Sequence, residues 1–190
     1  LLLFGLLLFY ALEFRHELSD DATPVQYLSA FFQSVTFRTA GFNSVGFGKL
    51  LPATYLVAAV FMFVGGASGS TAGGIKVNTF AVMYGYLRAT VRNRDAVILF
   101  RHSVPTKTVT RAFLVLLFGI AAVTIGTILL ALCESAPLEH LVFEVVSAFG
   151  TVGLSAGITP GLSMPGKVII SVLMFLGRLG PLTILAAATR

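Results

Sequence analysis

Charged residues are scarce in this sequence. They make up 11% of its 190 residues, whereas hydrophobic residues make up 56%. A soluble globular domain carries about 25% charged residues, so this chain lacks the charges that a water-exposed surface requires. The scarcity excludes a soluble protein, and it excludes a soluble nucleic-acid-binding domain in spite of the net charge of +5. We therefore predict an integral membrane protein.

Residue patterns typical of catalytic and metal sites are also missing. The single cysteine, Cys133, excludes a disulfide within the chain. The histidines lack metal-ligand spacing, and no Ser/His/Asp, Cys/His or paired-carboxylate pattern indicates an enzyme. The glycine-rich residues 65–74 are not a nucleotide-binding P-loop, because Ile75 follows Gly74 where such a loop has lysine. We expect neither enzymatic activity nor a cofactor.

Long apolar segments are what the sequence has instead. Residues 112–133 form an uncharged run of 22 residues, which is long enough to cross a bilayer as a helix. Residues 168–189 form a second long apolar run, which carries one charge, Arg178. Residues 51–87 form a longer run that a glycine-rich stretch interrupts. Residues 1–12 would span only ~18 Å as a helix, so we expect them to end a span that begins in preceding sequence.

Two further apolar segments, residues 24–36 and 137–148, are too short to cross a membrane. Each covers ~20 Å as a helix, and each has a proline at its start, where proline removes no helical hydrogen bond. We predict that both enter the membrane and turn back. Six basic residues between positions 88 and 111 place that segment in the cytoplasm and the short helices on the outer side. We expect this basic segment to contact anionic lipid or a cytosolic subunit.

The sequence contains an internal repeat. A shift of 112 residues aligns FRTAGFNS (37–44) with FGTVGLSA (149–156) without gaps. The same shift aligns FMFVGGASGST (61–71) with LMFLGRLGPLT (173–183). Both copies run in the same direction through the membrane, which favours a pore-like arrangement around an axis along the membrane normal.

The predicted fold is therefore an all-α, polytopic membrane protein with two tandem repeats of span, short helix, loop and span. The expected boundaries are 1–87 for the first repeat with its broken second span, 88–111 for a cytoplasmic basic loop, and 112–190 for the second repeat.

A T-x-G pattern follows each short helix. The carboxyl end of a helix carries partial negative charge, which favours a cation there. A glycine with positive φ lets neighbouring carbonyls turn toward a common axis, where they replace the hydration shell of a monovalent cation. A single T-x-G would indicate no more than a tight turn, but its duplication favours an ion filter. The predicted filter residues are Thr39, Ala40, Gly41, Phe42 and Asn43 in the first T-x-G loop and Thr151, Val152, Gly153, Leu154 and Ser155 in the second.

Three polar residues around these loops have a predicted structural role. We expect Glu144 to accept hydrogen bonds that support the second T-x-G loop from behind. Asn43 and Ser155 are expected to close their loops, although a pore-facing role is an alternative. Because each loop has one glycine, we expect fewer ion sites and weaker selectivity for potassium over sodium than in a potassium channel.

The glycine tract, residues 65–74, is predicted to be unwound. A continuous helix over residues 51–87 would measure ~55 Å, well beyond the bilayer. Close helix packing explains two or three of the glycines but not all of them beside SGST. An unwound segment at membrane depth must line water or protein. The tract comprises Gly65, Gly66, Ala67, Ser68, Gly69, Ser70, Thr71, Ala72, Gly73 and Gly74, and we expect Lys76 to anchor it through carbonyl contacts.

Arg178 is a charge ~15 Å into its predicted span, where it costs about 2.5–3.5 kcal/mol. A paired structural arginine is the plain interpretation. The 112-residue shift places it opposite Gly66, however, so we expect it to face the axis below the filter and to donate to carbonyls of the tract.

The T-x-G loops, GGASGSTAGGIK and MFLGRLGPLT together resemble the Trk/Ktr/HKT superfamily of potassium transporters, most of all the membrane subunit of bacterial Ktr systems. The resemblance implies four span–pore-helix–span repeats around one pore, of which this chain carries the last two. It also implies that residues 65–74 and Arg178 form the gate of a potassium uptake pathway in the plasma (inner) membrane. The implied partners are membrane lipids, a second copy in a homodimer and a cytosolic ring of nucleotide-binding subunits, with Na⁺ as a candidate activator.

Two alternatives stay open. In a secondary active transporter, the glycine tract would form a discontinuous substrate-binding helix and move with its repeat. A non-conducting scaffold would bind cytosolic partners without passing ions.

Overall fold

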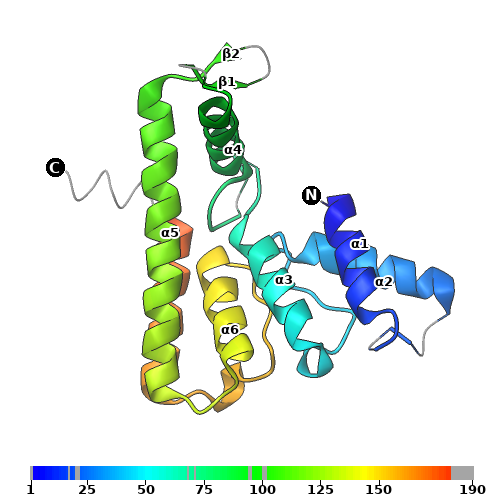
Figure 1. Cartoon of the computed structure of the whole chain (residues 1–190). Helices are drawn as coiled ribbons and strands as arrows, with labels where there is room; N and C mark the ends of the chain where they lie inside the picture. Colours follow the sequence, from blue (N-terminus) through cyan, green and yellow to red (C-terminus); the bar gives the residue numbers. More distant parts are fainter. Residues whose placement is uncertain are drawn as a thin grey trace.

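The computed structural model describes residues 2–16, 18–19, 22–67, 69–70, 72–93, 96–99 and 102–180 (Figure 1). The helices of these ranges are α1 (Leu2–Glu13), α2 (Thr23–Thr36), α3 (Pro52–Phe63), α4 (Val77–Val91), α5 (Thr106–Cys133), α6 (Leu138–Gly150) and α7 (Met164–Leu179). Short 3₁₀ turns lie at Phe47–Lys49 and Thr159–Gly161. The helical fold is as predicted, except that β1 (Ile98–Leu99) and β2 (His102–Ser103) pair as a small antiparallel hairpin.

The same order of elements occurs in both halves of the chain. A helix, a shorter helix, an extended T-x-G loop and another helix follow one another as α1, α2 and α3, and again as α5, α6 and α7. The two short helices begin and end within two residues of their predicted bounds. Pro24 lies in the first turn of α2 and Pro137 is the residue before α6, where neither interrupts a helical hydrogen bond.

The segment between the halves differs from the predicted loop of residues 88–111. Helix α4 continues to Val91, and α5 begins at Thr106, so helices occupy both ends of that segment. Lys107 and Arg111 belong to the first turns of α5, which makes this helix longer than the uncharged run inside it. Hydropathy marks where the apolar run ends, whereas the helix ends where capping and backbone bonding end.

Among the described residues, α5 is the helix that is long and apolar enough to cross a membrane. Helices α1 and α3 are apolar but have 12 residues each. The last predicted span, residues 168–189, is described only to position 180, and within that part α7 begins earlier than expected, at Met164. Ser163 explains the earlier start, because its hydroxyl accepts a hydrogen bond from Gly166 N at 3.3 Å and caps the helix.

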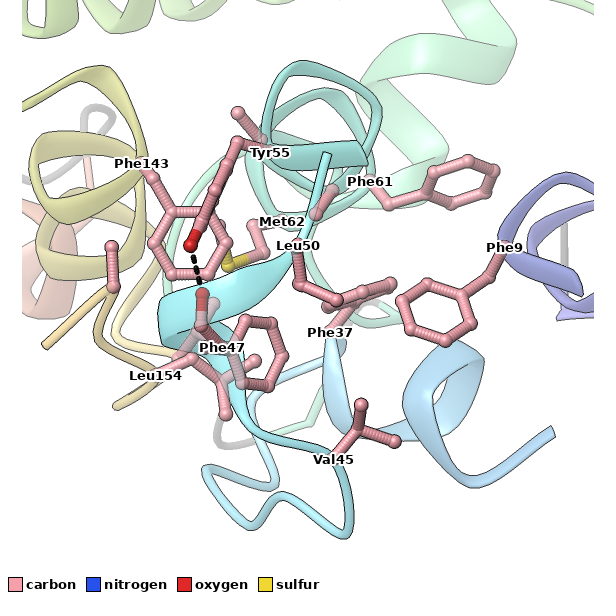
Figure 2. Packing of buried hydrophobic residues seen from close by; sticks show 14 of the residues in the cluster. Phe9, Phe37, Val45, Phe47, Leu50, Tyr55, Phe61, Met62, Phe143 and Leu154 are labelled. Carbon is pink, nitrogen blue, oxygen red and sulfur yellow. Dashed lines mark hydrogen bonds between the residues drawn. The ribbon is translucent and has the colours of Figure 1, made fainter. Parts of the chain in front are cut away.

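Buried aromatic rings join the two halves (Figure 2). The ring of Phe47 lies 6.4 Å from that of Phe37, at the end of α2, and 5.5 Å from that of Phe143 in α6. Tyr55 of α3 packs edge-on against Phe143 at 5.4 Å. Large rings dominate the burial energy of such a core, so this cluster holds the end of α2 close to α6. The two T-x-G loops are thereby brought side by side.

The two short helices differ in how deeply they are packed. Nine of the 13 residues of α6 are buried, because α3, α5 and α7 surround it. Helix α2 buries four of its 14 residues and exposes apolar side chains that include Leu28 and Phe31. The second T-x-G loop therefore starts from a rigid position, and α2 has an apolar side that the described part of this chain does not cover.

Candidate functional site

The two T-x-G loops have the same backbone conformation at equivalent positions. Thr39 and Gly41 have φ values of 71° and 76°, and Thr151 and Gly153 have φ values of 53° and 92°. Positive φ is uncommon for threonine, so its occurrence in both loops is specific to this structure. The 112-residue repeat of the sequence is therefore also a repeat of the local backbone.

The two loops touch at their glycines. A Cβ atom added to Gly41 would lie 2.8 Å from the Val152 carbonyl oxygen and 3.8 Å from the Gly153 Cα. A Cβ atom added to Gly153 would lie 3.5 Å from the Gly41 Cα. Each glycine is thus required by its positive φ, and Gly41 also by the closeness of the facing chain. The structure brings the two predicted filter loops together.

Each short helix holds one carbonyl of its own loop. The Thr36 hydroxyl donates to the Phe42 carbonyl, and the Phe42 N–H donates back to Thr36 Oγ1 at 3.1 Å. At the equivalent position of the second loop, the Ser147 hydroxyl donates to the Leu154 carbonyl at 2.6 Å. These bonds fix both loops to the ends of α2 and α6.

The remaining carbonyls at the meeting point have no such donor. Within the described part of the chain, the carbonyl oxygens of residues 39–41 and 151–153 accept no hydrogen bond from the protein. Ala40 and Gly153 are exposed, Thr39, Gly41 and Thr151 are half-buried, and Val152 is buried. Carbonyls that are accessible and have no donor in the protein are free to bind water or a cation. Of the ten predicted filter residues, Phe42 and Leu154 are the two whose carbonyls accept a hydrogen bond within the described part of the chain.

Glu144 supports the second T-x-G loop, as predicted. Its carboxylate accepts hydrogen bonds from Ala156 N at 3.1 Å, from Thr159 Oγ1 at 2.9 Å and from the Ser155 hydroxyl. Ser155 in turn accepts from Gly157 N at 2.9 Å, so its side chain closes the loop.

The first T-x-G loop is closed by amide side chains instead. Asn43 Nδ2 donates to the Val45 carbonyl at 3.2 Å, which confirms the expected loop-closing role. Gln33 Nε2 donates to Ser44 Oγ at 3.3 Å from within α2. The two loops thus have similar backbone conformations, but different side chains support them.

The described residues of the glycine tract are not helical, as predicted, and lie between α3 and α4. Ser68 and Thr71 lie outside the described residues. Gly65 N donates to the Ile75 carbonyl at 2.8 Å, and Val77 N donates to the Gly66 carbonyl at 3.2 Å, which ties the two ends together. The Lys76 ammonium donates to the carbonyls of Ser70, at 3.1 Å, and Ala72, which confirms its anchoring role.

The tract lies against the carboxyl end of α6 (Figure 1). Gly73 N donates to Thr151 Oγ1 at 3.0 Å. A Cβ atom on Gly74, where φ is +68°, would lie 3.2 Å from the Gly150 Cα. The tract therefore contacts the first residue of the second T-x-G loop directly.

Arg178 lies near the same end of α6. It is an exposed residue in the last turn of α7. The preceding residue, Gly177, packs so closely on α6 that an added Cβ atom would lie 1.8 Å from the Phe149 carbonyl oxygen. The tract and the turn of α7 that carries Arg178 thus both border the last turn of α6.

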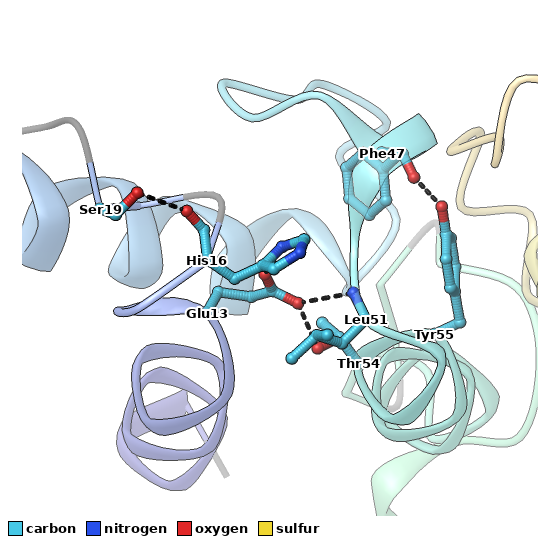
Figure 3. Close-up of polar contacts among 7 residues, drawn as sticks. All are labelled: Glu13, His16, Ser19, Phe47, Leu51, Thr54 and Tyr55. Atoms are coloured by element: carbon cyan, nitrogen blue, oxygen red, sulfur yellow. Dashed lines mark hydrogen bonds and ion pairs between the residues drawn. The ribbon is translucent and has the colours of Figure 1, made fainter.

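The sequence did not predict the structural role of two acidic residues. Glu13 Oε1 accepts from Leu51 N at 3.0 Å and from the Thr54 hydroxyl at the start of α3 (Figure 3). Glu134 Oε1 accepts from Ser163 N at 2.9 Å and Ser163 Oγ at 2.5 Å at the start of α7. In each half, a carboxylate at the end of the first helix thus caps the positive amino end of the last.

The gapless shift could not reveal this pair. Glu13 and Glu134 lie 121 positions apart rather than 112, because the connection from α1 to α2 is longer than that from α5 to α6 and because α2 begins farther from its T-x-G loop than α6 does. Aligning the ends of the first helices, with a gap allowed after them, would have paired the two residues.

Comparison with known proteins gives consistent matches. Residues 4–189 match the TrkH family, described as "Cation transport protein". The Ktr system potassium uptake protein B of Vibrio alginolyticus is 44% identical over 97% of this chain and 41% of its own length. The protein of the same name from Bacillus subtilis (strain 168) is 44% identical over 82% of this chain and 35% of its own length.

A structural match agrees on the fold. The potassium transporter TrkH from Vibrio parahaemolyticus superposes with a TM-score of 0.79 at 21% identity, covering 98% of this chain and 42% of that one. This chain therefore spans about two-fifths of the length of these related proteins.

Proposed function

The chain belongs to the TrkH family of cation transport proteins, and on that premise we propose that it carries potassium ions into the cell through a gated pore. The observation that carries the proposal is the meeting of the two T-x-G loops at Gly41 and Gly153. Around this point lie the unpartnered carbonyls of residues 39–41 and 151–153. Relatives named as potassium uptake proteins support the choice of ion and a transporter rather than an enzyme.

The proposed mechanism uses the charge distribution of the short helices. The carboxyl ends of α2 and α6 lead into the two loops, so their partial negative charges stabilise a dehydrated cation there. Carbonyl oxygens replace its water shell, and the ion moves down its electrochemical gradient with no chemical step. The glycine tract, on the cytoplasmic side of the second loop, closes the pathway together with Arg178, and opening requires the tract to move aside.

Two repeats cannot enclose a pore alone, so we propose that they complete one with two further repeats. The share of the relatives that the chain spans supports this, as do the exposed apolar side of α2 and Phe42, which is 71% exposed. The complete pore would lie in the plasma (inner) membrane and pair as a homodimer. A cytosolic ring of nucleotide-binding subunits would contact the basic segment after α4, and Na⁺ would serve as an activator, with no cofactor.

Potassium and rubidium uptake by the complete gene product in a potassium-starved host tests the proposal. Gly41→Ser and Gly153→Ser should each lower potassium affinity and admit sodium, because a Cβ atom disfavours the positive φ and, at Gly41, meets the Val152 carbonyl. Gly48→Ala, where an added Cβ meets nothing within 4 Å, is the matched control. If both serine variants keep the wild-type selectivity for potassium over sodium, the two T-x-G loops do not form the ion filter.

The rival function is secondary active transport. In that case the glycine tract binds a substrate, and uptake is coupled to an ion at a fixed ratio. Measuring charge moved per rubidium ion in proteoliposomes separates the two. A fixed ratio other than one charge per ion, dependent on a second substrate, would favour the rival.

A further inference from the structure

The hydroxyl of Thr151 connects the glycine tract to the second T-x-G loop. Its Oγ1 atom accepts a hydrogen bond from Gly73 N at 3.0 Å, across 78 positions of sequence. Thr151 has a left-handed backbone at the end of α6, and its own N–H is bonded to the Ala148 carbonyl at 3.0 Å. The backbone of Thr151 is thus fixed to the end of α6, and the tract donates a hydrogen bond to its side chain.

The donor in this bond is strengthened by Lys76. Its ammonium donates to the Ala72 carbonyl, which belongs to the same peptide group as the Gly73 N–H. A positive charge on the oxygen side polarises that peptide, and hydrogen bonds in such chains reinforce one another. Lys76, the 72–73 peptide and Thr151 therefore form one continuous chain of hydrogen bonds.

Packing at this contact leaves no spare room. A Cβ atom on Gly73 would lie 2.4 Å from Thr151 Oγ1 and 2.6 Å from Thr151 Cγ2. Any side chain at position 73 would therefore push the tract away from α6. The contact thus depends on a glycine at position 73 as well as on the threonine at 151.

We infer that the Thr151 hydroxyl is shared between the gate and the ion pathway, and that it takes part in only one of them at a time. While the tract lies against α6, Thr151 Oγ1 faces the positive end of the Gly73 N–H, which repels a cation at the same oxygen. When the tract withdraws, that oxygen becomes a further ligand at the cytoplasmic end of the filter. Opening the gate and completing the lowest ion site would then be one event. The inference rests on the proposed function.

The first half of the chain supplies an internal control. Thr39 is equivalent to Thr151 by the repeat and has the same left-handed backbone, with φ of 71°. Within the described residues, its hydroxyl has no hydrogen bond to the glycine tract. A change at Thr39 should therefore affect ion binding alone, whereas the same change at Thr151 should affect both ion binding and gating.

The experiment compares Thr151→Val, Thr151→Ser and Thr39→Val in the complete gene product, each with the tract intact and with residues 69–73 deleted. Rubidium uptake is measured without activation of the cytosolic partner, at matched protein levels, together with the concentration for half-maximal uptake. Thr151→Val should raise resting uptake by about 2- to 12-fold, the factor that corresponds to one net hydrogen bond. Thr151→Ser keeps the hydroxyl and should raise resting uptake less than Thr151→Val does, and Thr39→Val should weaken ion binding without raising resting uptake.

With the tract shortened, Thr151→Val and Thr39→Val should become alike, because no tract remains to contact position 151. Equal resting uptake of Thr151→Val and Thr39→Val in both backgrounds would overturn the inference while leaving the filter intact. If neither variant changes ion affinity or selectivity, the filter assignment itself fails, which is a different result.

Two further variants keep the test decisive if Thr151→Val does not accumulate in the membrane. Lys76→Gln weakens the donor and should raise resting uptake without changing ion affinity. Gly73→Ala should do the same by displacing the tract, and Gly161→Ala, where an added Cβ meets nothing within 4 Å, is its control. Resting uptake at the wild-type level in both Lys76→Gln and Gly73→Ala would also overturn the inference.

Discussion

Replacing Glu144 should weaken both the second T-x-G loop and the stability of the protein. The carboxylate is buried, with 4% of the residue exposed, and it holds the second T-x-G loop at Ser155, Ala156 and Thr159. Glu144→Leu removes every acceptor at once while filling similar volume. Glu144→Gln keeps one carbonyl oxygen and places an amide near Thr159, whose hydroxyl can turn to accept from it.

The free-energy cost differs among the three donors, because they differ in whether another acceptor remains when the carboxylate is removed. The Ala156 N–H is buried and loses its acceptor in Glu144→Leu, which costs about 1–3 kcal/mol. The hydroxyls of Thr159 and Ser155 are 2.8 Å apart and keep each other as partners, so their loss adds about 1 kcal/mol. We expect a total of about 2–4 kcal/mol for Glu144→Leu and about 1 kcal/mol for Glu144→Gln.

The assay combines selectivity with thermal stability. Potassium over sodium selectivity should fall strongly in Glu144→Leu and little in Glu144→Gln, and the melting temperature of the purified protein should follow the same order. Glu139→Gln, a half-buried residue in the first turn of the same helix, is the control and should change neither. Equal selectivity and melting for the leucine and glutamine variants would refute the reasoning, because the loop would then not depend on these hydrogen bonds.

Three other outcomes follow from the structure. If the proposed gate is correct, Arg178→Ala should raise potassium flux, because it removes a fixed positive charge from the proposed pathway. Combined with a shortened tract, the gain should be less than the sum of the separate gains, and wild-type flux in Arg178→Ala would place the barrier elsewhere. Thr124→Val and Thr127→Val should leave rubidium uptake near wild type, since α5 is expected to face lipid, and a large loss at normal expression would contradict this. Glu134→Ala should lower the melting temperature through loss of the cap on α7, worth about 0.5–2 kcal/mol, and unchanged melting would show that the cap contributes nothing.

Local features of the chain were readable from the sequence because their causes are local. Hydropathy and proline positions predicted α2 and α6 to within two residues, since helix entry depends on the residues of the first turn. Glycine content predicted the break at residues 65–74, because an interior glycine costs about 1 kcal/mol in a helix. The repeated T-x-G pattern predicted matching backbones, and the positive φ of Gly41 and Gly153 bears this out.

Contacts between distant segments were decided by the tertiary structure alone. The aromatic cluster around Phe47 and Phe143 determines that the two T-x-G loops meet, and no local pattern encodes which rings pack together. The bond from Gly73 to Thr151 likewise depends on how α3, α4 and α6 are placed. Sequence determines which backbone conformations a segment can adopt, because those preferences act within a few residues. Which donor finds which acceptor across the fold depends on the packing of whole helices, and that is where the proposed link between gate and filter arises.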